Sequence, residues 1–123
     1  MKHRELTERI LGAAIEVHRH LGPGLLESVY ETCTAHEFSL QKIPFESQKQ
    51  VEILYKGVRL AADLRADFIV DSKVVVELKA VDAILPIHRA QLLTYMQLCK
   101  CEVGLLINFN SDQLMRGVER FVL

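Results

Sequence analysis

Two acidic residues and a lysine stand at positions that could form one reactive site: Asp67, Glu77 and Lys79. Glu77 and Lys79 are two residues apart in the run Val74–Lys79, and alternate residues of a β-strand point to the same face. Carboxylates with water suit Mg²⁺ or Mn²⁺, and an ammonium beside them could hold an attacking water or stabilise a phosphoryl group. These groups fit metal-dependent hydrolysis of a phosphodiester bond.

Whether Asp67 joins this pair depends on the loop between the two expected strands. If the loop has three residues, Asp71–Lys73, Asp67 lies directly opposite Glu77, whereas a two-residue loop turns its carboxylate away. Two neighbouring carboxylates repel each other when both are ionised, and a divalent cation relieves that repulsion. A functional site therefore requires the longer loop or an equivalent bulge. The alternative is an ion pair between Glu77 and Lys79 on a solvated face.

Further polar candidates lie on two expected helices. Within Pro86–Cys99, His88, Gln91 and Tyr95 share one helical face among apolar residues, and polar groups on a buried helix need partners. Gln91 and Tyr95 either contact the site or serve a neighbouring loop and the core. Glu27 stands in the first turn of its helix, where the helix dipole favours a carboxylate; the alternative is that it points at the metal.

The N-terminal third is expected to form two helices, about Glu5–His20 and Leu25–Leu40, because Gly22-Pro23-Gly24 interrupts the helical pattern. Apolar residues at steps of three and four define the inward face of each helix. They are Leu6, Ile10, Ala14, Val17 and Leu21 in the first helix, and Leu26, Val29, Tyr30, Cys33 and Phe38 in the second.

Alternation of apolar and polar residues predicts strands after Gln48. The expected strands are Val51–Tyr55, Val58–Leu60, Leu64–Val70, Val74–Lys79, Val103–Phe109 and Phe121–Leu123, with a short helix at Asp112–Gly117. Three consecutive valines, Val74–Val76, indicate a strand buried on both faces at the centre of the sheet. The helix Pro86–Cys99 then connects two parallel strands.

The composition fits one globular domain over residues 1–123, with 50% hydrophobic and 25% charged residues. No apolar run approaches the ~20 residues that span a bilayer, so a membrane protein is not expected. A net charge of −1 excludes a uniformly basic nucleic-acid binder. Cys33, Cys99 and Cys101 are expected to be reduced thiols in a cytoplasmic protein, and no zinc site is expected at His18 and His20.

The motif Gly24-x-x-Glu27-x-x-Tyr30 resembles the defining motif of the GxxExxY proteins, small prokaryotic chains of the PD-(D/E)XK nuclease superfamily. The resemblance extends over Arg65-Ala66-Asp67, Val76–Lys79 and Leu105–Phe109. It implies a single domain of the α/β (α+β) class with an αβββαβ core, in which a mixed central sheet is flanked by helices.

The same resemblance implies roles for the candidate residues. Asp67 and Glu77 match the metal ligands and Lys79 the catalytic lysine. Gln91-x-x-x-Tyr95 is similar to an element of the exonuclease branch in which the Gln and Tyr contact the site and the DNA strand. Glu27 matches a helical acid that assists the metal.

We therefore expect a nuclease that uses Mg²⁺ (or Mn²⁺) and acts on DNA. The expected nucleic-acid contacts are Arg65, His88, Gln91 and Tyr95. One alternative is a catalytically silent module that uses the same fold to bind nucleic acid or a partner protein. Another is a structural or regulatory subunit that pairs through an exposed sheet edge. A homodimer is compatible with the nuclease and with the binding module.

Overall fold

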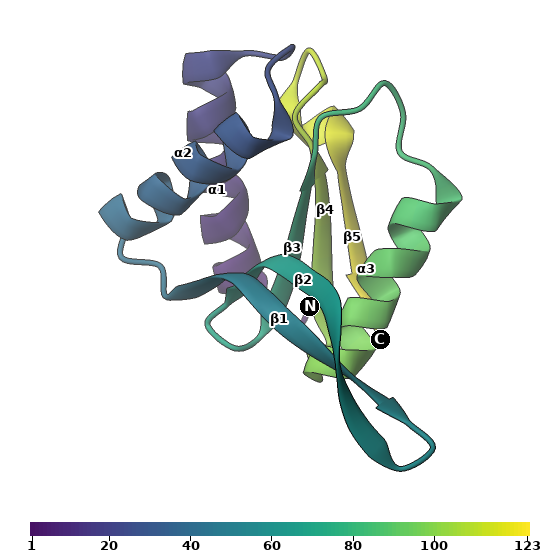
Figure 1. Cartoon of the computed structure of the whole chain (residues 1–123). Coiled ribbons are helices and arrows are strands. Elements are labelled where there is room, and N and C mark those ends of the chain that lie inside the picture. The colour runs from purple at the N-terminus through teal and green to yellow at the C-terminus, as the bar shows by residue number, and fades with distance from the viewer.

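A five-stranded mixed sheet with helices on both faces makes up the computed structural model, which describes residues 1–123 (Figure 1). The strands are β1 (Phe45–Tyr55), β2 (Val58–Val70), β3 (Val74–Lys79), β4 (Val103–Asn108) and β5 (Val118–Val122). The helices are α1 (Arg4–Leu21), α2 (Glu27–Leu40), α3 (Pro86–Cys99) and the short 3₁₀ helix η1 (Leu114–Gly117). This architecture confirms the expected fold class.

The strands follow their chain order in the sheet, β1-β2-β3-β4-β5, which puts β3 at the centre. Residues Val74–Leu78 of β3 are buried, and β-branched valines pack well on a pleated surface. β3 pairs with β4 in parallel through α3, as predicted, and every other strand pair is antiparallel. The central strand therefore carries Glu77 and Lys79.

Separate apolar cores lie on the two faces of the sheet. Figure 1 shows α1 and α2 on one face and α3 on the other. The first core includes Ile10, Val17, Tyr30, Phe38, Phe68 and Phe109, and the second includes Val51, Ile69, Val75, Leu92, Tyr95 and Met96. Val75 packs beneath α3. Alternate residues of a strand point to the same face, so Glu77 and Lys79 emerge on the face that α3 covers.

The inward face of α2 differs from the prediction. Tyr30 and Phe38 are fully buried, but Leu26 is 74% exposed and Val29 is 37% exposed. The helix begins at Glu27, and Leu26 precedes it in extended conformation as the N-cap residue. Leu26 therefore lies outside the helical periodicity that predicted its burial.

Two predicted strands, Val58–Leu60 and Leu64–Val70, form one continuous strand, β2. A register irregularity in its pairing with β1, between Gln50 and Glu52, accommodates the segment Ala61–Asp63 that interrupted the pattern. The resulting β1–β2 hairpin projects beyond the rest of the sheet (Figure 1).

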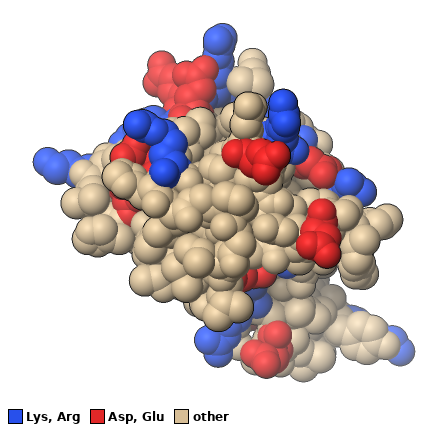
Figure 2. Space-filling model, turned by 90° about the horizontal axis from the view of Figure 1, so that it is seen from above, with Lys and Arg blue, Asp and Glu red and all other residues tan.

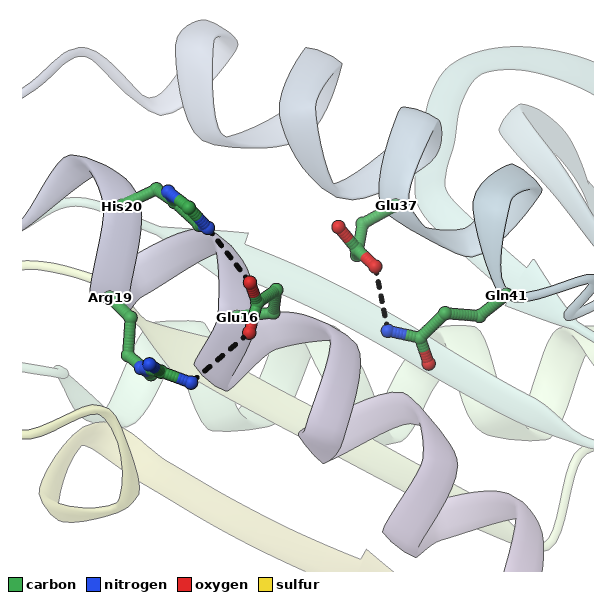
Figure 3. A network of polar contacts seen from close by, with 5 residues as sticks. All are labelled: Glu16, Arg19, His20, Glu37 and Gln41. Carbon is green, nitrogen blue, oxygen red and sulfur yellow. Dashed lines mark hydrogen bonds and ion pairs between the residues drawn. The ribbon is translucent and has the colours of Figure 1, made fainter.

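Exposed polar pairs lie near the C-terminal ends of α1 and α2 (Figure 3). Glu16 accepts hydrogen bonds from Arg19 (3.3 Å) and pairs with His20 (2.8 Å), and Gln41 donates to Glu37 (2.7 Å). Exposed pairs of this kind contribute little to the free energy of unfolding.

The cysteines form no disulfide, and His18 contacts a backbone carbonyl. Cys33, Cys99 and Cys101 are unpaired, and the His18 ring nitrogen Nε2 donates to the carbonyl of Ser111 at 2.7 Å. None of the helices is both long and apolar enough to cross a lipid bilayer.

Close packing of α3 on β4 gives a stability prediction. A Cβ at Gly104 would collide with the Met96 sulfur and lie 3.1 Å from Leu92 Cδ1. We expect Gly104→Ala to lower the free energy of unfolding by about 1–3 kcal/mol, measured by urea denaturation. Gly12→Ala is the control, because nothing lies within 4 Å of its Cβ position and alanine favours a helix interior. Equal stability of both variants would contradict the packing argument.

Candidate active site

Asp67 and Glu77 face each other across β2 and β3. The loop Asp71–Lys73 has three residues, so that Val70 pairs with Val74 and Asp67 falls opposite Glu77. The Asp67 N–H donates to Glu77 Oε1 at 3.2 Å, and the Leu78 N–H donates to Asp67 Oδ2 at 2.8 Å. The longer loop predicted for a functional site is confirmed.

The acid pair is buried. Asp67 is 8% exposed and Glu77 is 4% exposed, so the alternative of a solvated Glu77–Lys79 ion pair is wrong. Burial and, after it, the nearby Asp67 charge raise the pKa of Glu77 to about 9, although Lys79 opposes the shift. Without a cation, the Glu77 carboxyl therefore retains its proton at neutral pH.

Lys79 lies at the end of β3, partly buried, among the acids. Its positive charge lowers the pKa of both Glu77 and Glu27. Its backbone carbonyl accepts a hydrogen bond from the Phe109 N–H at 2.8 Å, which fixes this end of β3 against the segment after β4. The structure thus brings the lysine and the predicted acids together.

The turn before α2 determines where Glu27 lies. Gly24 adopts φ +97°, a conformation that glycine accepts readily. The Tyr30 hydroxyl donates to the Gly22 carbonyl and accepts from the Leu25 N–H. The Tyr30 ring stacks on Phe109, with 4.5 Å between the ring centroids. Glu27 follows this hydrogen-bonded turn as the first residue of α2.

The electrostatic environment of Glu27 places it beside the site. Burial raises its pKa, Lys79 lowers it, and Asp67 and Glu31 raise it. Its position at the start of α2 also suits the helix dipole. Glu27 is therefore near enough to Asp67 and Lys79 for their charges to act on it, and its role at a metal stays a prediction.

Two residues in the site, Glu31 and Gln48, were not predicted from the sequence. Gln48 Nε2 donates to Asp67 Oδ1 at 3.3 Å and also to Glu31 Oε1. Burial raises the pKa of Glu31, Gln48 lowers it and Asp67 raises it. The four-residue step from Glu27 to Glu31 could have indicated a shared helical face, but nothing in the local pattern indicates Gln48.

Asn108 is a further buried polar residue that the sequence did not single out for a role. Its Oδ1 accepts from the Val81 N–H at 3.1 Å, and its Nδ2 donates to the Val81 carbonyl at 2.9 Å. Asn108 also lies beside Lys79 in the β3–β4 pairing. It therefore holds the segment that follows Lys79 against the end of β4.

Tyr95 approaches the acids from α3, whereas Gln91, one turn earlier, is exposed. Tyr95 is 3% exposed, and its hydroxyl accepts a hydrogen bond from Gln91 Nε2 at 3.2 Å. Burial raises the pKa of Tyr95, and the charges of Glu77 and Asp67 raise it further. Tyr95 is thus a core residue whose hydroxyl lies near the acid pair.

Neither Arg65 nor His88 makes a side-chain hydrogen bond or salt bridge to Glu27, Asp67 or Glu77. Arg65 is exposed two residues before Asp67, with its Nε 4.0 Å from Asp63 Oδ1. His88 Nδ1 accepts from the Leu85 N–H at 3.0 Å, which caps the start of α3. Figure 2 shows acidic and basic side chains interspersed around an uncharged area, with no continuous basic surface on that face.

The donor set fits a hard divalent cation. Four carboxylates, those of Glu27, Glu31, Asp67 and Glu77, influence one another, and Lys79 is the cation among them. No three such side chains are gathered closely enough to hold an ion by themselves. Mg²⁺ commonly takes one or two carboxylates and completes its shell with water and substrate phosphates, which the pair Asp67 and Glu77 can accommodate.

The raised pKa of Glu77 predicts how stability depends on pH. The unfolded carboxyl has a pKa near 4.5 and the folded one near 9, so the folded state retains a proton that the unfolded state loses. We expect the melting temperature of metal-free protein to fall as pH rises from about 5 to 9. Glu77→Gln, whose amide oxygen can still accept from Asp67 N–H, should reduce this slope. If the melting temperatures of wild type and Glu77→Gln changed with pH in parallel, Glu77 would not be the source of the pH dependence.

One protein-family model, that of the PD-(D/E)XK nuclease superfamily, matches residues 4–121. No curated protein and no solved structure matches the chain. The matched span contains every site residue described above.

Proposed function

The chain belongs to the PD-(D/E)XK nuclease superfamily, and on this premise we propose that it is a divalent-cation-dependent nuclease that hydrolyses phosphodiester bonds in DNA. The observation that carries the proposal is the buried pair Asp67 and Glu77, opposed across β2 and β3 with Lys79 on the same face. Burying two acids beside a partly buried lysine is costly unless these groups serve a ligand or one another.

Asp67 and Glu77 would hold Mg²⁺ or Mn²⁺, with Glu27 as a supporting acid. When bound, the cation supplies positive charge to a phosphoryl oxygen and lowers the pKa of a coordinated water. Glu77 must release its proton to become a ligand, because its pKa is about 9 in the metal-free site. Cation binding should therefore be accompanied by proton release.

The other residues would orient the substrate and the water. The Lys79 ammonium is suited to hold the attacking water or to stabilise the charge that develops on the phosphoryl group. Tyr95 and Gln91 would position the DNA strand, and Arg65 and His88 would contact it from outside the acid cluster. Arg65 is the best placed of these for a phosphate, since it is exposed two residues from Asp67.

The direct test is incubation with single-stranded, duplex and branched DNA, and with RNA, in Mg²⁺ or Mn²⁺. We expect DNA cleavage that stops on chelation. Cation binding without cleavage of any substrate would contradict the proposal and favour a catalytically silent binding module.

We place the protein in the cytoplasm of a prokaryote, where its three unpaired cysteines would stay reduced. A homodimer is part of the proposal, because a chain of 123 residues covers little of a duplex. Sedimentation velocity of the protein with and without DNA measures this directly, and a monomer in both conditions would exclude the homodimer. A partner protein would then have to supply the additional binding surface.

A further inference from the structure

Gln48 lies within β1 directly opposite Asp67. The pairs Ser47–Phe68 and Lys49–Ala66 flank it in the β1–β2 register. Gln48 itself has φ 51°, in the left-handed region that non-glycine residues seldom occupy. Such a backbone persists where surrounding contacts compensate for its strain.

Those contacts are two carboxylates from different elements. The side-chain amide nitrogen of Gln48 donates to Asp67 Oδ1 at 3.3 Å and to Glu31 Oε1 on α2. An amide nitrogen has two N–H groups and no net charge. It therefore joins two acids that would otherwise repel each other, without adding an ion to the site.

The position of this nitrogen is one that a cation would also favour. A group that bridges carboxylate oxygens of Asp67 and Glu31 lies between two acids, where positive charge is stabilised, and the N–H dipoles of the amide provide part of that stabilisation. While the amide occupies this position, it engages Glu31 Oε1 and Asp67 Oδ1. The other oxygen of Asp67 and the carboxylate of Glu77 are left to bind an ion.

We propose that Gln48 limits this site to a single divalent cation, by occupying with its amide nitrogen the place between Glu31 and Asp67 that a second ion would take. The inference rests on the proposed function, because it presumes a first cation at Asp67 and Glu77. Gln48 acts as a positioning and specificity-determining residue and takes no part in bond cleavage.

The test is the number of Mn²⁺ ions bound per chain, measured by calorimetric titration and by electron paramagnetic resonance. Wild type should bind one ion. Gln48→Glu replaces the donor with a carboxylate and should bind two, with a spectrum broadened by coupling between the ions. Gln48→Ala, which removes the nitrogen without adding charge, should admit a second ion with a Kd at least about tenfold above the first.

Gln50→Glu is the matched control, since Gln50 is exposed on the same strand two residues away and pairs with Arg65. It adds the same charge but should leave the stoichiometry at one. Two ions in wild type, or one ion in both Gln48 variants, would overturn the inference while leaving the proposed function standing. No ion in wild type would instead overturn the proposed function.

Discussion

Asp67→Asn is expected to lower DNA cleavage by about 10³-fold or more and to weaken Mn²⁺ binding by at least about 10-fold. Asp67 faces Glu77, accepts from Leu78 N–H at 2.8 Å, and raises the pKa of Glu77. Asparagine has nearly the same shape and its carbonyl can still accept that hydrogen bond. The loss would therefore come from the missing negative charge.

Asp63→Asn is the control for this variant. Asp63 lies on the same strand, is fully exposed at its side chain, and has only a 4.0 Å contact with Arg65. It should retain both cleavage and Mn²⁺ affinity. Cleavage would be followed with labelled DNA and cation binding by calorimetry. Undiminished Mn²⁺ binding by Asp67→Asn would remove this residue from the metal site.

Lys79→Ala is expected to separate catalysis from cation binding. Cleavage should fall by about 10²–10³-fold, the loss typical of removing one group that stabilises transition-state charge. Mn²⁺ affinity should stay the same or increase, because the Lys79 charge no longer competes for the acids it influences, Glu77 and Glu27. A simple loss of folding would lower both measurements together.

Lys73→Ala tests whether this result is specific to position 79. Lys73 is exposed in the loop before β3 and pairs with Asp71 at 3.3 Å. Its removal should change neither cleavage nor cation binding. If Lys79→Ala cleaved DNA at the wild-type rate, the lysine would have no part in the reaction.

Much of the secondary structure could be predicted because its causes are local. Pro86 suits the first turn of a helix, and α3 has the predicted bounds, Pro86–Cys99. Three valines in succession predicted the central strand β3. Leu26 shows the limit of this reasoning, since a start of α2 two residues later than predicted left this side chain exposed.

The register of Asp67 shows a different limit. A two-residue or a three-residue loop was compatible with the sequence, and the two would point the carboxylate to opposite faces. The structure has the longer loop, in which Asp71 and Ser72 have φ values of 51° and 56°. Neither residue is glycine, so the local sequence carried no strong signal of this backbone.

The amino-acid sequence alone determined that Glu77 and Lys79 share a face, because the two-residue period of a strand follows from backbone geometry. Its motifs also indicated the superfamily that the family model then matched. Only the tertiary structure decided that Glu31, Gln48 and Asp67 meet, and how far burial raises the pKa of Glu77. Spacing within one element is set by the covalent chain, whereas proximity between elements depends on loop conformation and on packing over the whole fold.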